Sequence, residues 1–203
     1  MKADEFKSRK IGVLMGGHNA EHEVSMKTGA ATAAALHSRG YQRVDIEVGP
    51  DLAEVLLRKK IEVAFVALHG LWGEDGCVQG LLEVMRIPYT GSGVLASALS
   101  MDKVMAKAMF RQYGLPVIQD RVVTHQEAES FDPVDLPFEL PVVVKPSREG
   151  SSVGTHIVHS PEEFRAALKD AARFAGDVLV ERYLKGREIQ VAVLDDRAMG
   201  AIE

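Results

Sequence analysis

The segment from Pro141 to Gly154 contains the residues best suited to chemistry. Its apolar, β-branched start ends at Lys145, and a loop of Ser, Gly, Arg and Glu follows before a second strand-like run begins at Thr155. The backbone N–H groups and hydroxyls of such a loop can approach an anion closely, and Lys145 would add a positive charge at its base. Because Gly/Ser loops also occur in ordinary solvated hairpins, the segment alone permits a phosphate site without requiring one.

Two further candidate residues follow strand patterns near the N-terminus. Glu21 lies after two glycines, in the first turn of an expected helix, where a carboxylate either complements the helix dipole or binds a cationic ligand group. His69 ends another strand pattern beside a glycine-rich turn, and it is either structural or a ligand contact. His18 and His22 are four residues apart with no third metal ligand nearby, which disfavours a metal site there.

Charged residues also stand at element ends in the second half of the chain. Lys103 begins an expected helix, where a lysine opposes the helix dipole, and this indicates either an anionic ligand or a solvated surface position. Glu181 ends one expected strand and Glu188 begins the next. A strand end can hydrogen-bond the edge of a planar base, and an acid can accept hydrogen bonds from two ribose hydroxyls.

Alternating strand and helix patterns position the first of these residues. The expected elements are a strand over 11–15, a helix over 20–38, strands over 44–48 and 62–68, and helices over 51–60 and 78–85. Such alternation predicts an α/β fold, a parallel sheet with helices on both faces. Ligands of such sheets sit at the carboxyl ends of the strands, where Glu21 and His69 are expected.

The pattern changes near residue 100. A turn-rich connection over 88–93 precedes a helix that begins at residue 101 or 102, with Ser100 or Asp102 as its cap, and ends near 113. Beyond it we expect strands over 117–123, 142–145, 155–158, 178–183 and 188–194, and a helix over 161–174. This order predicts an α+β unit with an antiparallel sheet, and therefore two domains, residues 1–100 and 101–203.

The composition bounds the function. The chain has 203 residues, 46% hydrophobic and 26% charged, and its net charge of −5 disfavours a nucleic-acid or anionic-membrane surface. The single cysteine, Cys77, excludes an intrachain disulfide, fits a reducing compartment and is expected to be buried. Residues 1–10 lack the apolar core of a signal peptide, and no apolar run is long enough for a membrane span, so we expect a cytoplasmic protein. The chain stops within a strand pattern at Glu203, which we interpret as a truncation.

The order of the motifs resembles the D-alanine–D-alanine ligase family of the ATP-grasp superfamily. The motifs are GG-x-x-AE-x-E-V-S, HG-x-x-GEDG, YTGSG-x-x-AS-x-x-SMDK, VVVKPSREGSSVG and the turn from Glu181 to Glu188. The resemblance spans residues 11–203. It implies a Rossmann-like preATP-grasp domain followed by an ATP-grasp central subdomain that is incomplete at its C-terminus. The implied reaction is ATP-dependent joining of two D-alanines through an acyl phosphate, for peptidoglycan precursor synthesis.

The resemblance also assigns roles to single residues. Glu21 would hold the ammonium of the first D-alanine, His69 would lie beside that substrate, and Ser151 would orient it, with Glu21 and Ser151 as the catalytic residues. The nucleotide contacts would be Lys103 and Lys145 at the ATP phosphates, Ser151 and Ser152 in the loop over them, Glu181 and the Leu184 backbone at adenine, and Glu188 at the ribose.

The resemblance also implies expectations about metal binding, activity and oligomeric state. In the family the Mg²⁺ (or Mn²⁺) ligands, an arginine and a mobile lid follow the part present here, so we expect no metal ligands in this chain and no activity from it alone. Family members are commonly dimers, and we expect a homodimer formed through helices of the first domain. Two alternatives stay open: a ligase whose second substrate is D-lactate or D-serine, and a non-catalytic fragment that binds nucleotide or D-alanine.

Overall fold

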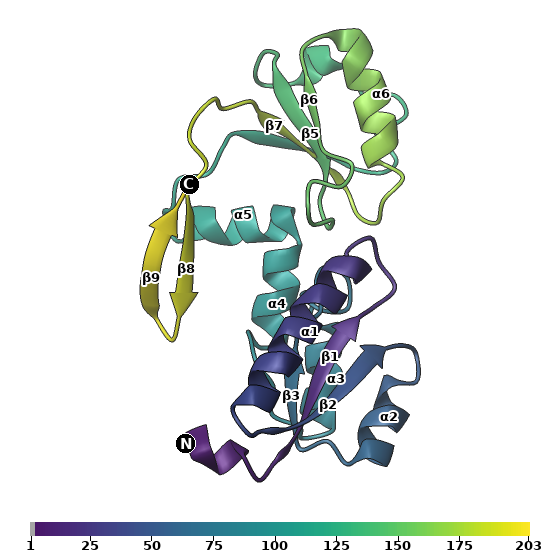
Figure 1. Ribbon diagram of the computed structural model, residues 1–203. Helices are drawn as coiled ribbons and strands as arrows, with labels where there is room; N and C mark the ends of the chain where they lie inside the picture. The colour runs from purple at the N-terminus through teal and green to yellow at the C-terminus, as the bar shows by residue number, and fades with distance from the viewer. Residues whose placement is uncertain (1–2) are drawn as a thin grey trace.

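A three-stranded parallel sheet organises the first half of the chain (Figure 1). The computed structural model describes residues 3–203, and in it β1 (Lys10–Gly16) lies between β2 (Gln42–Val48) and β3 (Val63–Val66). Nearly all of β1 is buried, as is typical of a central strand in a parallel sheet. The first two predicted strands are thus confirmed, each extended by one or two residues.

Helices cover both faces of this sheet, as predicted. On one face α1 (His22–Ser38) packs against Val13 and Met15, and on the other face lie α2 (Leu52–Lys59) and α3 (Cys77–Val84). The larger of the two cores includes Leu14, Ile46, Leu56, Ala64, Val78 and Leu82. Successive residues of β1 serve opposite faces because side chains alternate along a strand.

Two predictions about this unit are corrected by the structure. The predicted strand over 62–68 is shorter, and of the four residues of β3 Ala64 is buried while the others are partly exposed. The reason is its position, since a single bridge from Ala64 to Tyr89 lies beyond it in place of a full strand. Cys77, expected to be buried, is exposed because it is the first residue of α3 and lies at the rim of the core.

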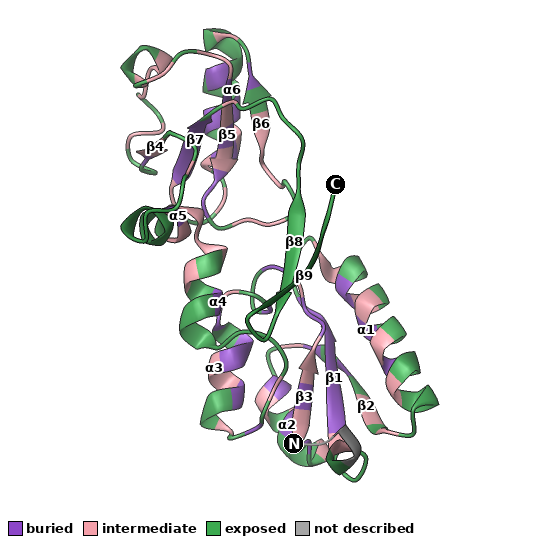
Figure 2. Ribbon diagram, turned by 90° about the vertical axis from the view of Figure 1, so that its left-hand side faces the viewer, coloured by how far each residue is buried: buried purple, intermediate pink, exposed green. Residues whose placement is uncertain are grey.

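Two short helices link the first unit to the second (Figure 2). The first, α4 (Val94–Met101), was not predicted, because it follows Gly93 without a polar capping residue. The second, α5 (Lys103–Gln112), confirms a predicted helix. The Asp102 carboxylate caps it by accepting hydrogen bonds from the backbone N–H groups of Val104 (3.0 Å) and Met105 (3.2 Å).

An antiparallel sheet organises the second unit, as predicted. Its strands lie in the order β4 (Asp120–Val123), β7 (Val178–Arg182), β5 (Val142–Pro146) and β6 (His156–Val158). One face is covered by α6 (Pro161–Ala171), and the core between them includes Phe164, Leu168, Val123, Val144, Val158 and Val180. The strands β5 and β6 form the predicted hairpin, so residues 147–155 are its loop.

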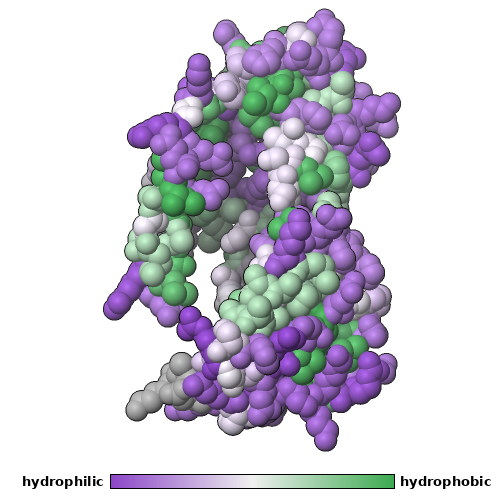
Figure 3. Space-filling model, in the orientation of Figure 1, coloured by the Kyte–Doolittle hydropathy of each residue, from purple (hydrophilic) through white to green (hydrophobic). Residues whose placement is uncertain are grey.

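The last two strands form a separate hairpin that stands apart from both units. In it β8 (Gln190–Leu194) pairs with β9 (Arg197–Ile202), and every residue of the two strands is exposed (Figure 2). Its apolar side chains contribute hydrophobic surface at the edge of the molecule (Figure 3). The strand predicted over 188–194 is confirmed, and β9 accounts for the strand pattern noted at the end of the chain.

Two 3₁₀ helices, η1 (Ala3–Phe6) and η2 (Pro133–Asp135), complete the structure. Among the helices of residues 3–203, none combines the length and the apolar character that a bilayer crossing requires. The domain boundary near residue 100 stays a prediction.

Candidate functional site

The two units meet where the β5–β6 loop reaches the start of α1 (Figure 1). The Ser151 hydroxyl in this loop donates a hydrogen bond to Oε1 of Glu21, which is the residue before α1. Glu21 follows the carboxyl end of the central strand β1, where a parallel sheet presents its ligand-binding edge. The structure therefore brings together two residues that the sequence resemblance assigned to one substrate.

Glycines on both sides press closely on the Glu21 carboxylate. A Cβ placed on Gly70 would lie 2.3 Å from Oε2 of Glu21, and a Cβ on Gly150 would lie 3.2 Å from the same atom. Gly70 also has a φ of +63°, a conformation that side-chain-bearing residues rarely adopt. The carboxylate is thus enclosed by one loop from each unit.

The tip of the β5–β6 loop has an unusual backbone. Ser151 and Ser152 are consecutive non-glycine residues with left-handed conformations, at φ +47° and +60°. Such conformations cost free energy and gather at functional sites and ligand clamps. The strain fits a loop whose position matters more than its local stability.

Asn19 joins the two strand-end loops of the first unit. Its Oδ1 accepts a hydrogen bond from the Glu21 N–H (2.8 Å), and its Nδ2 donates to the carbonyl oxygens of His69 and Leu71 (2.9 Å each). One side chain therefore sets the separation of Glu21 and His69. The sequence did not reveal this role, since an asparagine after two glycines also suits a helix cap.

The His69 ring is fixed between two elements. Its Nε2 lies 3.0 Å from the Thr28 hydroxyl on α1, and its Nδ1 lies 3.9 Å from a carboxylate oxygen of Glu74. The other oxygen of Glu74 accepts a hydrogen bond from the Gly70 N–H (2.8 Å). Thr28 and Glu74 thus hold His69 in place at the strand end, and its predicted role beside the first D-alanine stays a prediction.

Lys103 lies at the base of the β5–β6 loop. Its backbone N–H donates to the Ser147 carbonyl (2.9 Å), and its Nζ donates to the Glu149 carbonyl. Burial, and next the nearby charge of Lys145, lower the pKa of Lys103 below its ordinary value, although Glu149 and other acids oppose this. Two partly buried cations that face one loop form a site that an anion would stabilise.

Lys145 belongs to a buried chain of charges beneath that loop. Its Nζ lies 2.5 Å from Oε2 of Glu181, while Oε1 of Glu181 accepts a hydrogen bond from Lys107. Lys107 also lies 3.0 Å from Asp120, which pairs in turn with Arg111. Burial raises the pKa of Glu181, but the hydrogen bonds and charges of Lys107 and Lys145 outweigh it and hold the pKa below its ordinary value.

The sequence reasoning did not identify Lys107. It is 8% exposed, and it lies four residues after Lys103 on the same side of α5. That spacing is the signal that could have identified it, because a second lysine on one helical face directs both charges to the same neighbourhood.

The predicted adenine and ribose contacts lie farther along the chain. Leu184 lines a hollow of about 480 Å³ together with Arg182 and residues 116–119. The Glu181 side chain is turned toward the two lysines and is 6% exposed, whereas Glu188 is exposed. The roles of Glu181, Leu184 and Glu188 stay predictions.

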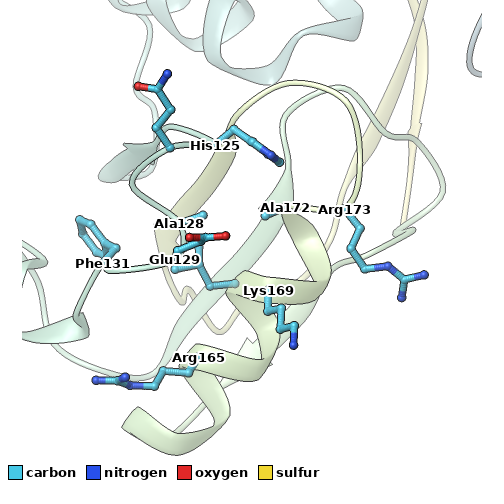
Figure 4. A pocket seen from close by; sticks show the side chains of 10 residues that line it. His125, Ala128, Glu129, Phe131, Arg165, Lys169, Ala172 and Arg173 are labelled. Atoms are coloured by element: carbon cyan, nitrogen blue, oxygen red, sulfur yellow. The ribbon is translucent and has the colours of Figure 1, made fainter.

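A second hollow, of about 710 Å³, lies between α6 and residues 125–131 (Figure 4). Its cations Arg165, Lys169 and Arg173 point away from one another in Figure 4, and Arg165 and Arg173 each pair with an aspartate. Diverging, partly neutralised cations do not form an anion site. We therefore place the candidate site at the β5–β6 loop.

No cluster of three or more His, Cys, Asp or Glu side chains in residues 3–203 is arranged to hold a metal ion. Of the two histidines near the start of α1, His22 pairs with Glu47 (3.1 Å) and His18 packs edge-on against Trp72.

Comparison with known proteins identifies the family of the chain. The family model described as D-ala D-ala ligase N-terminus matches residues 45–92, and that described as D-ala D-ala ligase C-terminus matches residues 109–203. The chain is 61% identical over all its residues to a D-alanine–D-alanine ligase from Geobacter sulfurreducens and 55% identical to one from Geotalea uraniireducens. It spans 64% and 65% of the lengths of these two relatives.

Solved structures give the same result. A D-alanine–D-alanine ligase from Bacillus anthracis superposes with a TM-score of 0.85 at 38% identity, covering 96% of this chain and 64% of the other. The same enzyme complexed with ATP gives a TM-score of 0.84 at 35% identity, covering 96% of this chain and 65% of the other. The chain therefore belongs to the D-alanine–D-alanine ligase family, within the ATP-grasp superfamily.

Proposed function

We propose that the protein carrying this chain joins two D-alanines at the expense of ATP, as a step in peptidoglycan precursor synthesis. The observation that supports this most is the hydrogen bond from Ser151 to Glu21. It places a carboxylate of the first unit beneath a loop of the second unit that has two lysines at its base. An amino acid bound at Glu21 and a phosphate group bound at the two lysines would therefore lie on either side of this loop.

On the substrate side the proposed roles follow from charge. Glu21 accepts hydrogen bonds from the ammonium of the first D-alanine, and the Ser151 hydroxyl orients that substrate. His69, held by Thr28 and Glu74, lies beside it. Glu21 and Ser151 are the proposed catalytic residues of this chain.

On the nucleotide side Lys103 and Lys145 neutralise ATP phosphates beneath Ser151 and Ser152. Phosphoryl transfer depends on alignment and charge neutralisation more than on a protein nucleophile. The D-alanine carboxylate takes the γ-phosphoryl group, which releases ADP and forms an acyl phosphate. The amine of the second D-alanine then attacks the carbonyl carbon, loses a proton and expels phosphate. Glu181 and the Leu184 backbone bind adenine, and Glu188 binds the ribose hydroxyls.

The role of Mg²⁺ or Mn²⁺ in the whole protein stays a prediction. The described residues 3–203 do not gather three metal-ligating side chains, so no step above passes through a metal ion.

The test is D-alanine-dependent release of phosphate from ATP by the full-length protein. We expect Glu21→Gln to abolish D-alanine dependence while ATP still raises the melting temperature. Glu23→Gln is the matched control, because Glu23 is an exposed carboxylate in the first turn of the same helix. Faster phosphate release with added D-lactate or D-serine would assign that second substrate instead. Ligand-induced stabilisation without turnover would indicate a protein that only binds.

We also propose a cytoplasmic homodimer that associates through helices of the first unit. Leu57 on α2 and Val84 on α3 are apolar side chains that are 70% and 84% exposed, and in this proposal the partner covers them. Light scattering on the wild type and on Val84→Lys would test this, since a dimer at this surface should dissociate in the variant.

A further inference from the structure

Lys107 lies at the centre of the buried charges beneath the candidate site. It reaches the sheet from α5, where its ammonium contacts Glu181, Asp120 (3.0 Å) and the Ile118 carbonyl (2.8 Å). These three oxygens match the three donors of an ammonium group. Lys107 is therefore fully hydrogen-bonded although it is only 8% exposed, and the proposed mechanism gives it no role.

Each carboxylate oxygen of Glu181 contacts a different lysine, and the two lysines differ in how far they are buried. Oε1 is bound by Lys107, which is 8% exposed, and Oε2 by Lys145, whose side chain is 22% exposed at the base of the loop. A carboxylate offers about four acceptor positions, so each oxygen keeps capacity for another donor. Lys107 therefore fixes the plane of the Glu181 carboxylate and leaves it able to accept further hydrogen bonds.

Charge balance gives Lys107 a second effect. The cluster contains Arg111, Lys107 and Lys145 against Asp120 and Glu181, which leaves one positive charge in excess. With Lys107 present, Glu181 keeps a cationic partner when Lys145 turns to a phosphate. Without Lys107, the buried carboxylate would hold Lys145, because a buried charge left unpaired is costly.

We propose that Lys107 is a positioning residue that determines preference for adenine nucleotides. By fixing Glu181 as a charged acceptor, it allows the carboxylate to accept a hydrogen bond from the exocyclic amino group of adenine. Hypoxanthine presents a carbonyl oxygen at that position, which a fixed carboxylate repels. The inference rests on the proposed function, in which Glu181 contacts the base.

The experiment compares ATP with inosine triphosphate in binding titrations of the full-length protein. We expect the wild type to prefer ATP by about tenfold or more, the worth of a hydrogen bond to a charged group. Lys107→Met should lose most of this preference, and Lys107→Arg, which keeps the charge, should restore it. Lys169→Met is the control, since Lys169 is an exposed lysine on α6.

Lys107→Met can fail to fold because it removes the one buried cation that contacts both Asp120 and Glu181. The double variant Lys107→Met/Asp120→Asn removes one acid together with the lysine and tests the same point. An unchanged ratio of ATP to inosine triphosphate affinity in either variant would overturn the inference while the proposed function stands. A wild type that binds ATP without preferring it would overturn the inference in the same way. A wild type that binds neither nucleotide would refute both.

Discussion

Ser151 donates a hydrogen bond to Glu21 across 130 residues of sequence and across the boundary between two sheets. The donor lies at the tip of a hairpin loop, and the acceptor lies at the start of a helix that follows a parallel strand. Each residue is held by its own unit, so the hydrogen bond reports how the units sit relative to each other. A substrate that contacts both residues would sense the same relationship.

Replacement of Ser151 by alanine should weaken D-alanine binding more than ATP binding. The variant lacks the hydroxyl that is proposed to orient D-alanine, and a hydrogen bond worth about 1 kcal/mol corresponds to about a fivefold loss of affinity. Thermal shift with D-alanine and with ATP, in separate titrations, measures the two effects.

Ser38→Ala is the control, because Ser38 donates a single bond to the Ala35 carbonyl at the exposed end of α1. Equal weakening of both ligands by Ser151→Ala would mean that this hydroxyl does not distinguish the two subsites.

Replacement of Gly70 by alanine should displace the Glu21 carboxylate. The new Cβ would lie 2.3 Å from Oε2 of Glu21, so the acid must move. The left-handed backbone at φ +63° adds a cost of about 1 kcal/mol. Calorimetric titration with D-alanine should show lost binding, and chemical denaturation should show lower stability.

Gly114→Ala separates these two effects. Gly114 has a similar φ of +71°, but a Cβ there meets no atom within 4 Å. This control should lose a similar amount of stability from backbone strain and keep D-alanine affinity. If both variants kept full affinity, the close approach of Gly70 to Glu21 would be irrelevant to the substrate.

Much of this arrangement could be predicted from local patterns. A buried apolar strand followed by glycines predicts a ligand edge, which placed Glu21 and His69, and the run ending at Lys145 predicted the hairpin. These features depend on residues close together in the chain. The hydrophobic periodicity of the sequence is therefore enough to predict such strands and the loops that follow them.

The remainder depends on packing between distant segments. The assignment of Ser151 and Glu21 to one substrate was implied by family resemblance alone, because no local pattern encodes the docking of two units. Asn19 was missed for the same reason, since its partners lie in another loop, whereas Lys107 carried a local signal in its spacing of four residues from Lys103. The helix α4 was missed because its capping residue, Gly93, gives no polar signal.

Replacement of Lys103 by methionine should separate folding from nucleotide binding. Burial and the nearby Lys145 lower the pKa of Lys103, so its charge opposes folding at neutral pH, and a neutral side chain of similar length removes this cost. We expect the variant without nucleotide to be at least as stable as the wild type toward denaturant.

The same variant should gain little from ATP. A ligand at 100 times its dissociation constant stabilises the folded state by about 2.7 kcal/mol, and this increment should be largely absent in Lys103→Met. An unchanged increment would remove Lys103 from the phosphate site.

The stability of the protein should fall in acid through Glu181. Its pKa lies below the ordinary value of 4.5 because the hydrogen bonds from Lys107 and Lys145 outweigh the opposing effect of burial. The folded state therefore binds this proton less readily than the unfolded state. The resulting stabilisation is complete above pH 4.5 and is lost as pH falls through the folded-state pKa below it.

Glu181→Gln tests this by removing the titrating group while it keeps an acceptor for one lysine. At pH 7 we expect the variant to be less stable by about 2 kcal/mol, because two buried lysines lose their shared anion. The difference from the wild type should shrink as pH falls below 4.5 and toward the lower folded-state pKa of Glu181, since below that pKa the protonated acid and the amide are both neutral. Urea denaturation from pH 7 to pH 3 measures the difference directly. A constant difference over that range would show that the charge on Glu181 does not stabilise the fold.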